Sequence, residues 1–202
     1  MSNTFLSAGQ GWCNRYLLMR HGHSQANQEG RIISTPERGL DAFGLSPDGH
    51  RQLDTLLPQW QWPTPTRIVH SDFLRTTETA LRVADHFGLT VQAEPRLRER
   101  NFGIFEGGPD SRYPDVWARD AEDAEHGDNG VESVSSVARR MSGVVAELER
   151  TRQGETILLV SHGDPLQILL TALDGRGLSR HREQIALAPA SVTPLSRNVS
   201  PP

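Results

Sequence analysis

Short apolar runs alternate with amphipathic stretches along most of the chain. The three clearest runs cover residues 16–19 (YLLM), 67–70 (RIVH) and 156–160 (TILLV), and polar or glycine residues follow each of them. Compact runs of about four to eight residues, rich in leucine and β-branched side chains, are typical of strands buried in a parallel sheet. We therefore predict parallel strands at these three positions.

Helical spacing is clearest in the stretches between these runs. Ser46 followed by Pro47 is a typical helix start, because serine caps the first turn and proline fits the first helical position. Residues 73–87 place apolar side chains at helical intervals, and Gly88 predicts the end of that helix. Residues 134–148 carry the most regular apolar stripe of the chain. We predict a helix in each stretch.

Two further helix signals lie in the second half of the chain. Asn129, three residues before Glu132, predicts a capping box in front of the striped helix. Asp164, followed by Pro165, predicts the N-cap of a last helix that continues to Leu173. The capping role is the simpler reading of Asp164, ahead of a catalytic one.

The order of these elements indicates the fold class. Alternating strands and helices favour an α/β fold with an open, mostly parallel sheet and helices on both faces. A length of 202 residues suits one catalytic domain that covers residues 1–202. We expect residues 1–14 and 196–202 to be loosely attached ends. Residues 107–130, rich in acidic residues and glycine, are expected to form a surface excursion or a lid.

Composition narrows the chemistry. All 21 basic residues are arginine, which excludes a lysine Schiff base and a P-loop lysine, so an anion site has to use arginine, histidine, backbone N–H groups or a metal. The only cysteine, Cys13, excludes an internal disulfide and a cysteine zinc site. A net charge of −4 gives no reason to expect a nucleic acid or a membrane as partner.

The next question is whether the sequence contains a targeting or membrane-spanning segment. Residues 1–15 lack the pattern of a signal peptide, and no stretch approaches the ~18 continuous apolar residues of a membrane span. We therefore expect a cytoplasmic protein. The sequence is compatible with a homodimer.

Candidate catalytic side chains gather where the predicted strands end. His21 and His162 each follow a strand and precede a glycine, Arg20 stands directly before His21, and Arg75 falls in the first turn of a helix. Ligands of open α/β sheets bind beyond the carboxyl ends of the strands. A dianionic phosphoryl group needs arginine forks for its oxygens and a neutral imidazole to attack phosphorus. Each residue alone is more often structural, but together they indicate a phosphate site.

Longer motifs surround these residues. They lie at positions 18–27 (LMRHGHSQAN), 45–52 (LSPDGHRQ), 71–80 (SDFLRTTETA), 97–107 (LRERNFGIFEG) and 160–163 (VSHG). In this order they resemble the histidine phosphatase superfamily, in its phosphoglycerate-mutase-like branch (branch 1). The resemblance runs from about residue 15 to 175 and implies the same α/β fold and phosphoryl transfer through a histidine.

The resemblance also implies a role for each matched residue. His21 would be the nucleophile and Glu99 the proton donor, which requires that burial or the phosphate charge raise the pKa of Glu99. The phosphoryl oxygens would be held by Arg20, Arg75 and His162. The expected substrate-binding residues are Ser24, Asn27, Arg100 and the backbone N–H of Gly163. No metal and no cofactor is implied, and the expected partner is a small phosphorylated metabolite.

The chain departs from the family pattern at two positions. His23 stands where the family usually has an acidic residue, a change that would act on the selectivity of the pocket. Asp164 follows the second histidine and glycine, where relatives commonly have Gly, Ala or Asn. The acid-phosphatase branch uses a His-Asp pair in which the Asp is the acid. Here Gly163 separates His162 from Asp164 and Glu99 is present, so we do not place the chain in that branch.

Several alternatives remain beside a phosphatase. His21 and His23 also form the H-x-H pair of metal-dependent amidohydrolases, but that class needs a barrel, further His and Asp ligands and often a lysine, demands that a lysine-free chain of 202 residues meets poorly. A phospholigand-binding module without catalysis is a second alternative, and a cofactor-dependent phosphoglycerate mutase or a sugar bisphosphatase is a third. A short acidic lid should leave the site open to water, which favours the phosphatase. Arg98 and Arg100 lead us to expect a preference for substrates with a second anionic group.

Overall fold

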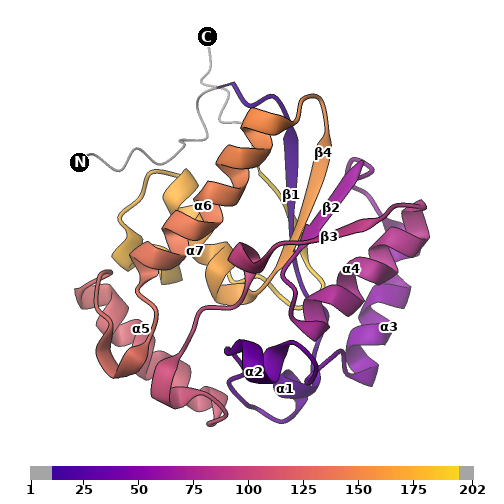
Figure 1. Cartoon of the computed structure of the whole chain (residues 1–202). Helices are drawn as coiled ribbons and strands as arrows, with labels where there is room; N and C mark the ends of the chain where they lie inside the picture. Colours follow the sequence, from indigo (N-terminus) through magenta and orange to yellow (C-terminus); the bar gives the residue numbers. More distant parts are fainter. Residues whose placement is uncertain (1–10, 196–202) are drawn as a thin grey trace.

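A five-stranded sheet forms the centre of the molecule. Figure 1 shows the protein as a computed structural model. The structure describes residues 11–195. Its strands are β1 (Arg15–Arg20), β2 (Arg67–His70), β3 (Val91–Ala93), β4 (Thr156–Ser161) and β5 (Val192–Pro194). The order is β3-β2-β4-β1-β5, and only the β1–β5 pair is antiparallel. The three predicted strands are confirmed as the parallel centre of the sheet. The two edge strands, β3 and β5, were not predicted.

Helices cover both faces of this sheet, as predicted. The main helices are α3 (Pro47–Leu56), α4 (Leu74–Phe87), α6 (Val134–Thr151) and α7 (Gly163–Leu173). Leu18 and Leu159 face α6 and α7, whereas Leu17 and Leu158 face α3 and α4, so successive side chains of each strand enter opposite cores. Burial on both faces explains why these strands read as continuous apolar runs.

The helix boundaries confirm some sequence signals and correct others. Ser46 caps α3, and Gly88 ends α4 in the left-handed conformation. The predicted capping box at Asn129 is wrong, because Ser133 caps α6 by accepting a hydrogen bond from the backbone of Ser136. Asp164 does not cap α7 either: His162 occupies the N-cap, and the Asp164 side chain points into a buried ionic network described below.

The remaining elements are short. They comprise α1 (Gln25–Gln28), α2 (Pro36–Gly39), α5 (Tyr113–Glu122) and the 3₁₀ turns Leu57–Gln59, Pro95–Leu97, Gly103–Phe105, Asp110–Arg112, Asp128–Gly130 and Leu178–Glu183. The predicted excursion at residues 107–130 contains α5, which packs against the turn Leu178–Glu183. Its acidic residues do not all face solvent, because Asp120 is fully buried.

The expectation of a loose N-terminal segment is wrong for its last residues. Trp12 and Asn14 are buried, and the Asn14 side-chain amide donates hydrogen bonds to Glu149 Oε1 at 2.9 Å and to Arg152 O at 3.0 Å. These bonds attach the start of β1 to the end of α6. Residues 1–10 and the predicted tail, 196–202, lie outside the described residues. Among residues 11–195, no helix has the length and apolar character to cross a bilayer.

Candidate active site

His21 lies directly after β1 and is buried. Its Nδ1 lies 2.7 Å from the backbone oxygen of Gly22, which can only accept, so Nδ1 carries the proton. Its Nε2 accepts a hydrogen bond from Arg75 Nε at 3.1 Å and is therefore the nitrogen with the free electron pair. Burial, with Arg75 and Arg20 nearby, lowers the pKa of His21 well below 6.5. At neutral pH this imidazole is therefore neutral and held in one tautomer, with the free electron pair on Nε2.

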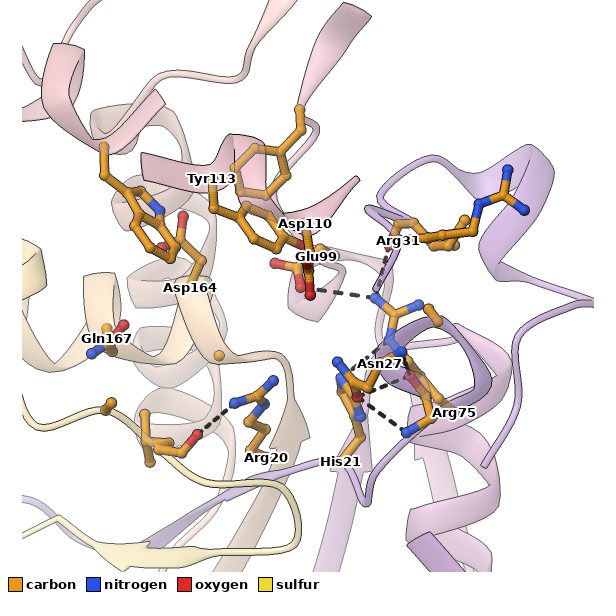
Figure 2. Close-up of a pocket in the computed structure, with 18 of the residues that line it drawn as sticks. Arg20, His21, Asn27, Arg31, Arg75, Glu99, Asp110, Tyr113, Asp164 and Gln167 are labelled. Atoms are coloured by element: carbon orange, nitrogen blue, oxygen red, sulfur yellow. Dashed lines mark hydrogen bonds and ion pairs between the residues drawn. The ribbon is translucent and has the colours of Figure 1, made fainter. Parts of the chain in front are cut away.

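Three buried N–H groups beside His21 have no hydrogen-bond partner among residues 11–195: Arg20 Nε, Arg75 Nη1 and His162 Nδ1. We call these three groups the donor cluster. The rest of each arginine is anchored, since Arg20 Nη1 donates to Leu187 O at 2.7 Å and Arg75 Nη2 donates to Ile33 O at 3.0 Å. Unpaired buried donors are costly. Arg20 and Arg75 line the cavity on either side of His21 (Figure 2), and the His162 ring lies 5.2 Å from the His21 ring, so these unpaired donors indicate an anion site.

The second histidine joins this cluster through a partner that the sequence did not reveal. The rings of His21 and His162 are 5.2 Å apart, edge to face. His162 Nε2 lies 2.9 Å from the hydroxyl of Ser71, which accepts a hydrogen bond from the Phe73 backbone N–H at 3.4 Å and keeps its own proton to donate to the ring. Burial, with Arg75 next in importance, lowers the pKa of His162 well below 6.5. Ser71 thus leaves the His162 proton on Nδ1, the nitrogen of the donor cluster.

Gly163, Asn27 and Ser24 line the same cavity, as expected. Gly163 begins α7 next to Arg20, where a Cβ atom would lie in van der Waals contact, 3.4 Å from the guanidinium. Ser24 and Asn27 cap the short helix α1, where the Ser24 backbone N–H donates to Asn27 Oδ1 at 3.1 Å. This bond uses the amide oxygen and leaves the Asn27 NH₂ group to act as a donor.

Glu99 stands opposite the donor cluster. Its side chain is 9% exposed, and Oε2 lies 3.8 Å from both Arg75 Nη2 and His162 Nδ1. Burial raises the pKa of Glu99 to about 7, although Arg75 opposes the shift, and the nearby Asp164 carboxylate adds to it. A carboxyl that is partly protonated near neutral pH suits a general acid. The position expected for Glu99 is thus confirmed as part of the cavity.

Beyond these groups the cavity, of about 270 Å³, continues toward the lid segment. Its outer wall includes Tyr113 and Trp117 of α5, whose rings are stacked 5.4 Å apart. The guanidinium of Arg182 lies over the Trp117 ring, with its Cζ atom 3.6 Å from the ring centroid. The excursion at residues 107–130 therefore covers part of the cavity with aromatic side chains, as a lid does.

The expectation that Arg100 contacts substrate is wrong. Arg100 is completely buried, does not line the cavity, and forms two hydrogen bonds of 2.7 Å with the Asp120 carboxylate. It also donates to Glu132 O at 2.7 Å and to Asp164 Oδ2 at 3.3 Å. Its backbone N–H donates to Glu99 Oε1 at 3.0 Å and so helps to position the Glu99 carboxyl group.

The second anion-binding residue expected from the sequence is also engaged elsewhere. Arg98 forms a bidentate ion pair with Asp72, with hydrogen bonds of 2.7 and 2.6 Å, and does not line the cavity. His23 likewise lies outside the cavity, and its Nδ1 lies 2.8 Å from the Ser46 hydroxyl. His21 and His23 therefore do not converge as metal ligands. Among residues 11–195, no group of three His, Cys, Asp or Glu side chains is arranged to hold a metal ion.

Several residues of the site were missed in the sequence. Ser71 precedes a matched arginine, but nothing local shows that its hydroxyl reaches a histidine 91 residues away. Tyr113 and Trp117 are spaced one helical turn apart, a signal that could have suggested a shared face. Arg182 and the backbone oxygen of Leu187 come from a segment that carried no motif.

A neutral histidine facing unpaired arginine and imidazole donors, at the carboxyl ends of a parallel sheet, defines a class of phosphoryl-transfer enzyme. Comparison with known proteins agrees: residues 16–200 match the family model of the histidine phosphatase superfamily (branch 1). The chain belongs to this superfamily.

Proteins similar to this chain include ones named as mutases and ones named as phosphatases. A probable phosphoglycerate mutase (GpmB) of Yersinia pestis is 33% identical over 172 residues, 83% of this chain and 77% of that protein. A mycobacterial glucosyl-3-phosphoglycerate phosphatase in complex with VO3 is 28% identical with a TM-score of 0.75, covering 90% of each chain. A Bacillus stearothermophilus protein, YhfR, is 25% identical with a TM-score of 0.76, covering 91% of each chain.

Proposed function

We propose that the protein is a phosphatase that hydrolyses small phosphomonoesters through a phosphohistidine on His21. The observation that carries this proposal is the donor cluster, Arg20 Nε, Arg75 Nη1 and His162 Nδ1, beside an unprotonated Nε2 of His21. These donors match the oxygens of a phosphoryl group, and they are preorganised by buried contacts before substrate arrives.

In the first step, His21 Nε2 attacks phosphorus and forms the P–N bond as the ester P–O bond breaks. The electron pair of the P–O bond leaves with the alcohol oxygen, which takes the proton of Glu99. The bond from Nδ1 to Gly22 O holds the ring in the reactive tautomer and stabilises the positive charge that develops on it. Arg20 and Arg75 balance the charge of the phosphoryl oxygens during transfer.

In the second step, water attacks phosphorus and the P–N bond breaks, which returns the electron pair to Nε2. Glu99, now a carboxylate, takes the proton of the attacking water. Inorganic phosphate leaves and Glu99 is protonated again, so both residues regain their starting states. All the charge needed for these steps comes from side chains of this chain, and the proposal requires no metal.

The choice of phosphatase over mutase depends on what reaches the phosphohistidine after the alcohol has left. The lid contains a single short α-helix, α5, and Asp110, in the turn that precedes it, lines the cavity with an exposed carboxylate. Such a lid favours entry of water and disfavours retention of a phosphorylated acid. The similarity to the mycobacterial phosphatase supports hydrolysis.

A phosphoglycerate mutase is the second candidate, favoured by the 33% identity to proteins named as probable phosphoglycerate mutases. Both enzymes would share the first step on His21. They differ in whether the phosphoryl group passes to water or returns to the bound acid.

The deciding experiment is a panel of phosphomonoesters scored for phosphate release, run beside an assay of 3- to 2-phosphoglycerate interconversion. We expect phosphate release without a bisphosphoglycerate primer, and none of it with His21→Ala. Primer-dependent interconversion faster than phosphate release by orders of magnitude would establish the mutase instead. Tight phosphoester binding without turnover would indicate a binding module.

A further inference from the structure

The two arginines that the sequence suggested for a second anionic group are not available for it. Arg98 and Arg100 are both bound to aspartates, and neither lines the cavity. The donor cluster is required for the transferring phosphoryl group. Recognition of the alcohol part of the substrate therefore depends on the other lining residues, and two of these are arginines, Arg31 and Arg182.

Arg31 has no free donor edge to offer. Its Nε and Nη2 both donate to Gly107 O at 3.2 Å, and its Nη1 lies 3.5 Å from Glu29 Oε2. Figure 2 shows its guanidinium turned away from His21. Arg31 is therefore unsuited to hold an anion inside the cavity.

Arg182, in the turn Leu178–Glu183, differs from Arg31 in this respect. Both hydrogen bonds of its guanidinium come from Nη1, which donates to Asp164 Oδ1 at 3.3 Å and to Gln167 Oε1. Its Nε and Nη2 have no hydrogen-bond partner within the described part of the chain, residues 11–195. Arg182 thus keeps one edge of the guanidinium, with two N–H groups, open to a ligand.

The open edge is the one that binds carboxylates elsewhere in the molecule. Arg98 holds Asp72 through Nε and Nη2, with hydrogen bonds of 2.7 and 2.6 Å. Arg67 holds Glu155 through the same two atoms, at 2.6 and 3.1 Å. On this edge a guanidinium offers two parallel N–H groups that match the oxygens of a carboxylate or a phosphate. Arg182 therefore has the donors of an anion site.

Contacts with the lid hold these donors close to the reacting group. With its Cζ atom 3.6 Å from the ring centroid, the Arg182 guanidinium has room only to lie flat on Trp117. The N–H bonds lie in the guanidinium plane, so the ring leaves the Nε–Nη2 edge uncovered. Burial lowers the pKa of Arg20, and the nearby charge of Arg182 acts in the same direction. Because one cavity of about 270 Å³ includes both arginines, a small substrate can reach both.

Two carboxylates line the same cavity, but neither is bound to the open edge. Asp164 accepts its hydrogen bond from Nη1 of Arg182. Asp110 belongs to the other wall, where its backbone N–H donates to Gly30 O at 2.8 Å, and Figure 2 shows Asp164 and Arg31 on opposite sides. The charges of these two carboxylates balance those of Arg31 and Arg182. The open donor edge, rather than an excess of positive charge, therefore carries the recognition.

We infer that Arg182 is a specificity-determining residue, and that its Nε–Nη2 edge binds a second anionic group, a carboxylate or a phosphate, on the alcohol part of the substrate. This inference rests on the proposed phosphatase function. It assigns to Arg182 the role that the sequence had suggested for Arg98 and Arg100. The Arg182 side chain is 32% exposed, so water reaches this subsite and the alcohol product can leave after transfer.

Three glycerol derivatives test the inference on the wild-type protein. Glycerol 3-phosphate, 3-phosphoglycerate and glycerol 1,3-bisphosphate differ only in one end group, which is CH₂OH, a carboxylate or a phosphate. We expect kcat/KM for phosphate release to be higher by about tenfold or more for at least one anionic member than for glycerol 3-phosphate, as charge-assisted hydrogen bonds would give. The preferred member identifies the anion. Equal or slower turnover of both anionic members would overturn the inference.

Variants assign the preference to Arg182. Arg182→Gln removes the charge and the open edge and should reduce the ratio of the two kcat/KM values to about one, whereas Arg182→Lys keeps the charge alone and should retain part of the preference. The ratio is measured within one variant, so a loss of folded protein does not change it. Arg180→Gln is the matched control, because Arg180 pairs with Glu183 on the same turn outside the cavity, and it should leave the ratio unchanged. An unchanged ratio in Arg182→Gln, or the same loss in Arg180→Gln, would contradict the inference.

A further substrate separates this inference from the proposed function. Nitrophenyl phosphate tests the chemistry on His21 and carries no second anionic group. If wild type does not release phosphate from any of the four substrates, the proposed function fails and this inference fails with it. If nitrophenyl phosphate is hydrolysed in a His21-dependent way but neither anionic glycerol derivative is preferred, only the inference on Arg182 fails.

Discussion

Glu99 allows a quantitative test of the mechanism, because its proton matters only when the leaving group is poor. Burial raises the pKa of Glu99 from 4.5 to about 7, with Arg75 opposing the shift. At pH 7 about half of the molecules then carry the proton, against roughly one in 300 for an unperturbed carboxyl. The environment of Glu99 thus increases the protonated fraction by about two orders of magnitude.

We therefore predict that Glu99→Gln slows transfer from glycerol 3-phosphate by ~10²–10⁴-fold, the usual contribution of a general acid. Transfer from nitrophenyl phosphate should slow by less than about tenfold, because nitrophenolate leaves without a proton. Single-turnover release of the alcohol isolates this step from the later attack of water. In wild type the rate with glycerol 3-phosphate should fall as pH rises through about 7, and the variant should lack this decrease.

Glu147→Gln is the matched control, since Glu147 makes an exposed ion pair with Arg96 and lies outside the cavity. It should leave both rates unchanged. Equal slowing of the two substrates by Glu99→Gln would refute the acid role and show that Glu99 only maintains the structure.

Three further predictions concern stability and metals. Asp120→Asn removes the closer of the two carboxylates that pair with the buried Arg100 and should cost about 3–5 kcal/mol, seen as a lower Tm; an unchanged Tm would contradict this account of the network. Burial lowers the pKa of His21 below its unfolded value of 6.5, so the unfolded state binds the proton first and stability is lost as pH falls below about 6.5. His21→Asn should therefore gain Tm relative to wild type between about pH 7.5 and 5.5, and a constant difference would refute the shift. Exhaustive chelation should leave turnover unchanged while vanadate inhibits; activity lost on chelation and restored by zinc would favour a metal mechanism.

The centre of the fold could be predicted from the sequence because its signals are local. Strands β1, β2 and β4 are buried on both faces, so their apolar runs report their environment directly. The same runs end at His21 and His162, and the parallel sheet brings those ends together. Strand β5 gave no such signal, because three residues at an antiparallel edge need little apolar character.

The role of Arg100 could not be predicted, because it depends on contacts distant in sequence. Next to Glu99 in the chain, an arginine is equally compatible with a substrate contact and a buried ion pair. The buried ion pair forms because Asp120 of α5 and Asp164 of α7 both reach the Arg100 guanidinium. Asp164 in turn looked like a helix cap, since an aspartate before a proline usually is one. Only the position of α7 in the fold shows that the Asp164 carboxylate faces Arg100.

The central claim is that His21 becomes phosphorylated on Nε2, and trapping that adduct tests it most directly. Turnover of a substrate labelled in its phosphoryl group would be quenched by denaturation in base, followed by peptide mapping. Because Nδ1 is committed to Gly22 O, the account predicts a base-stable, acid-labile phosphoryl group on Nε2 of His21. His21→Ala should give no adduct and no turnover. An adduct on His162, or near-normal turnover by His21→Ala, would contradict the account.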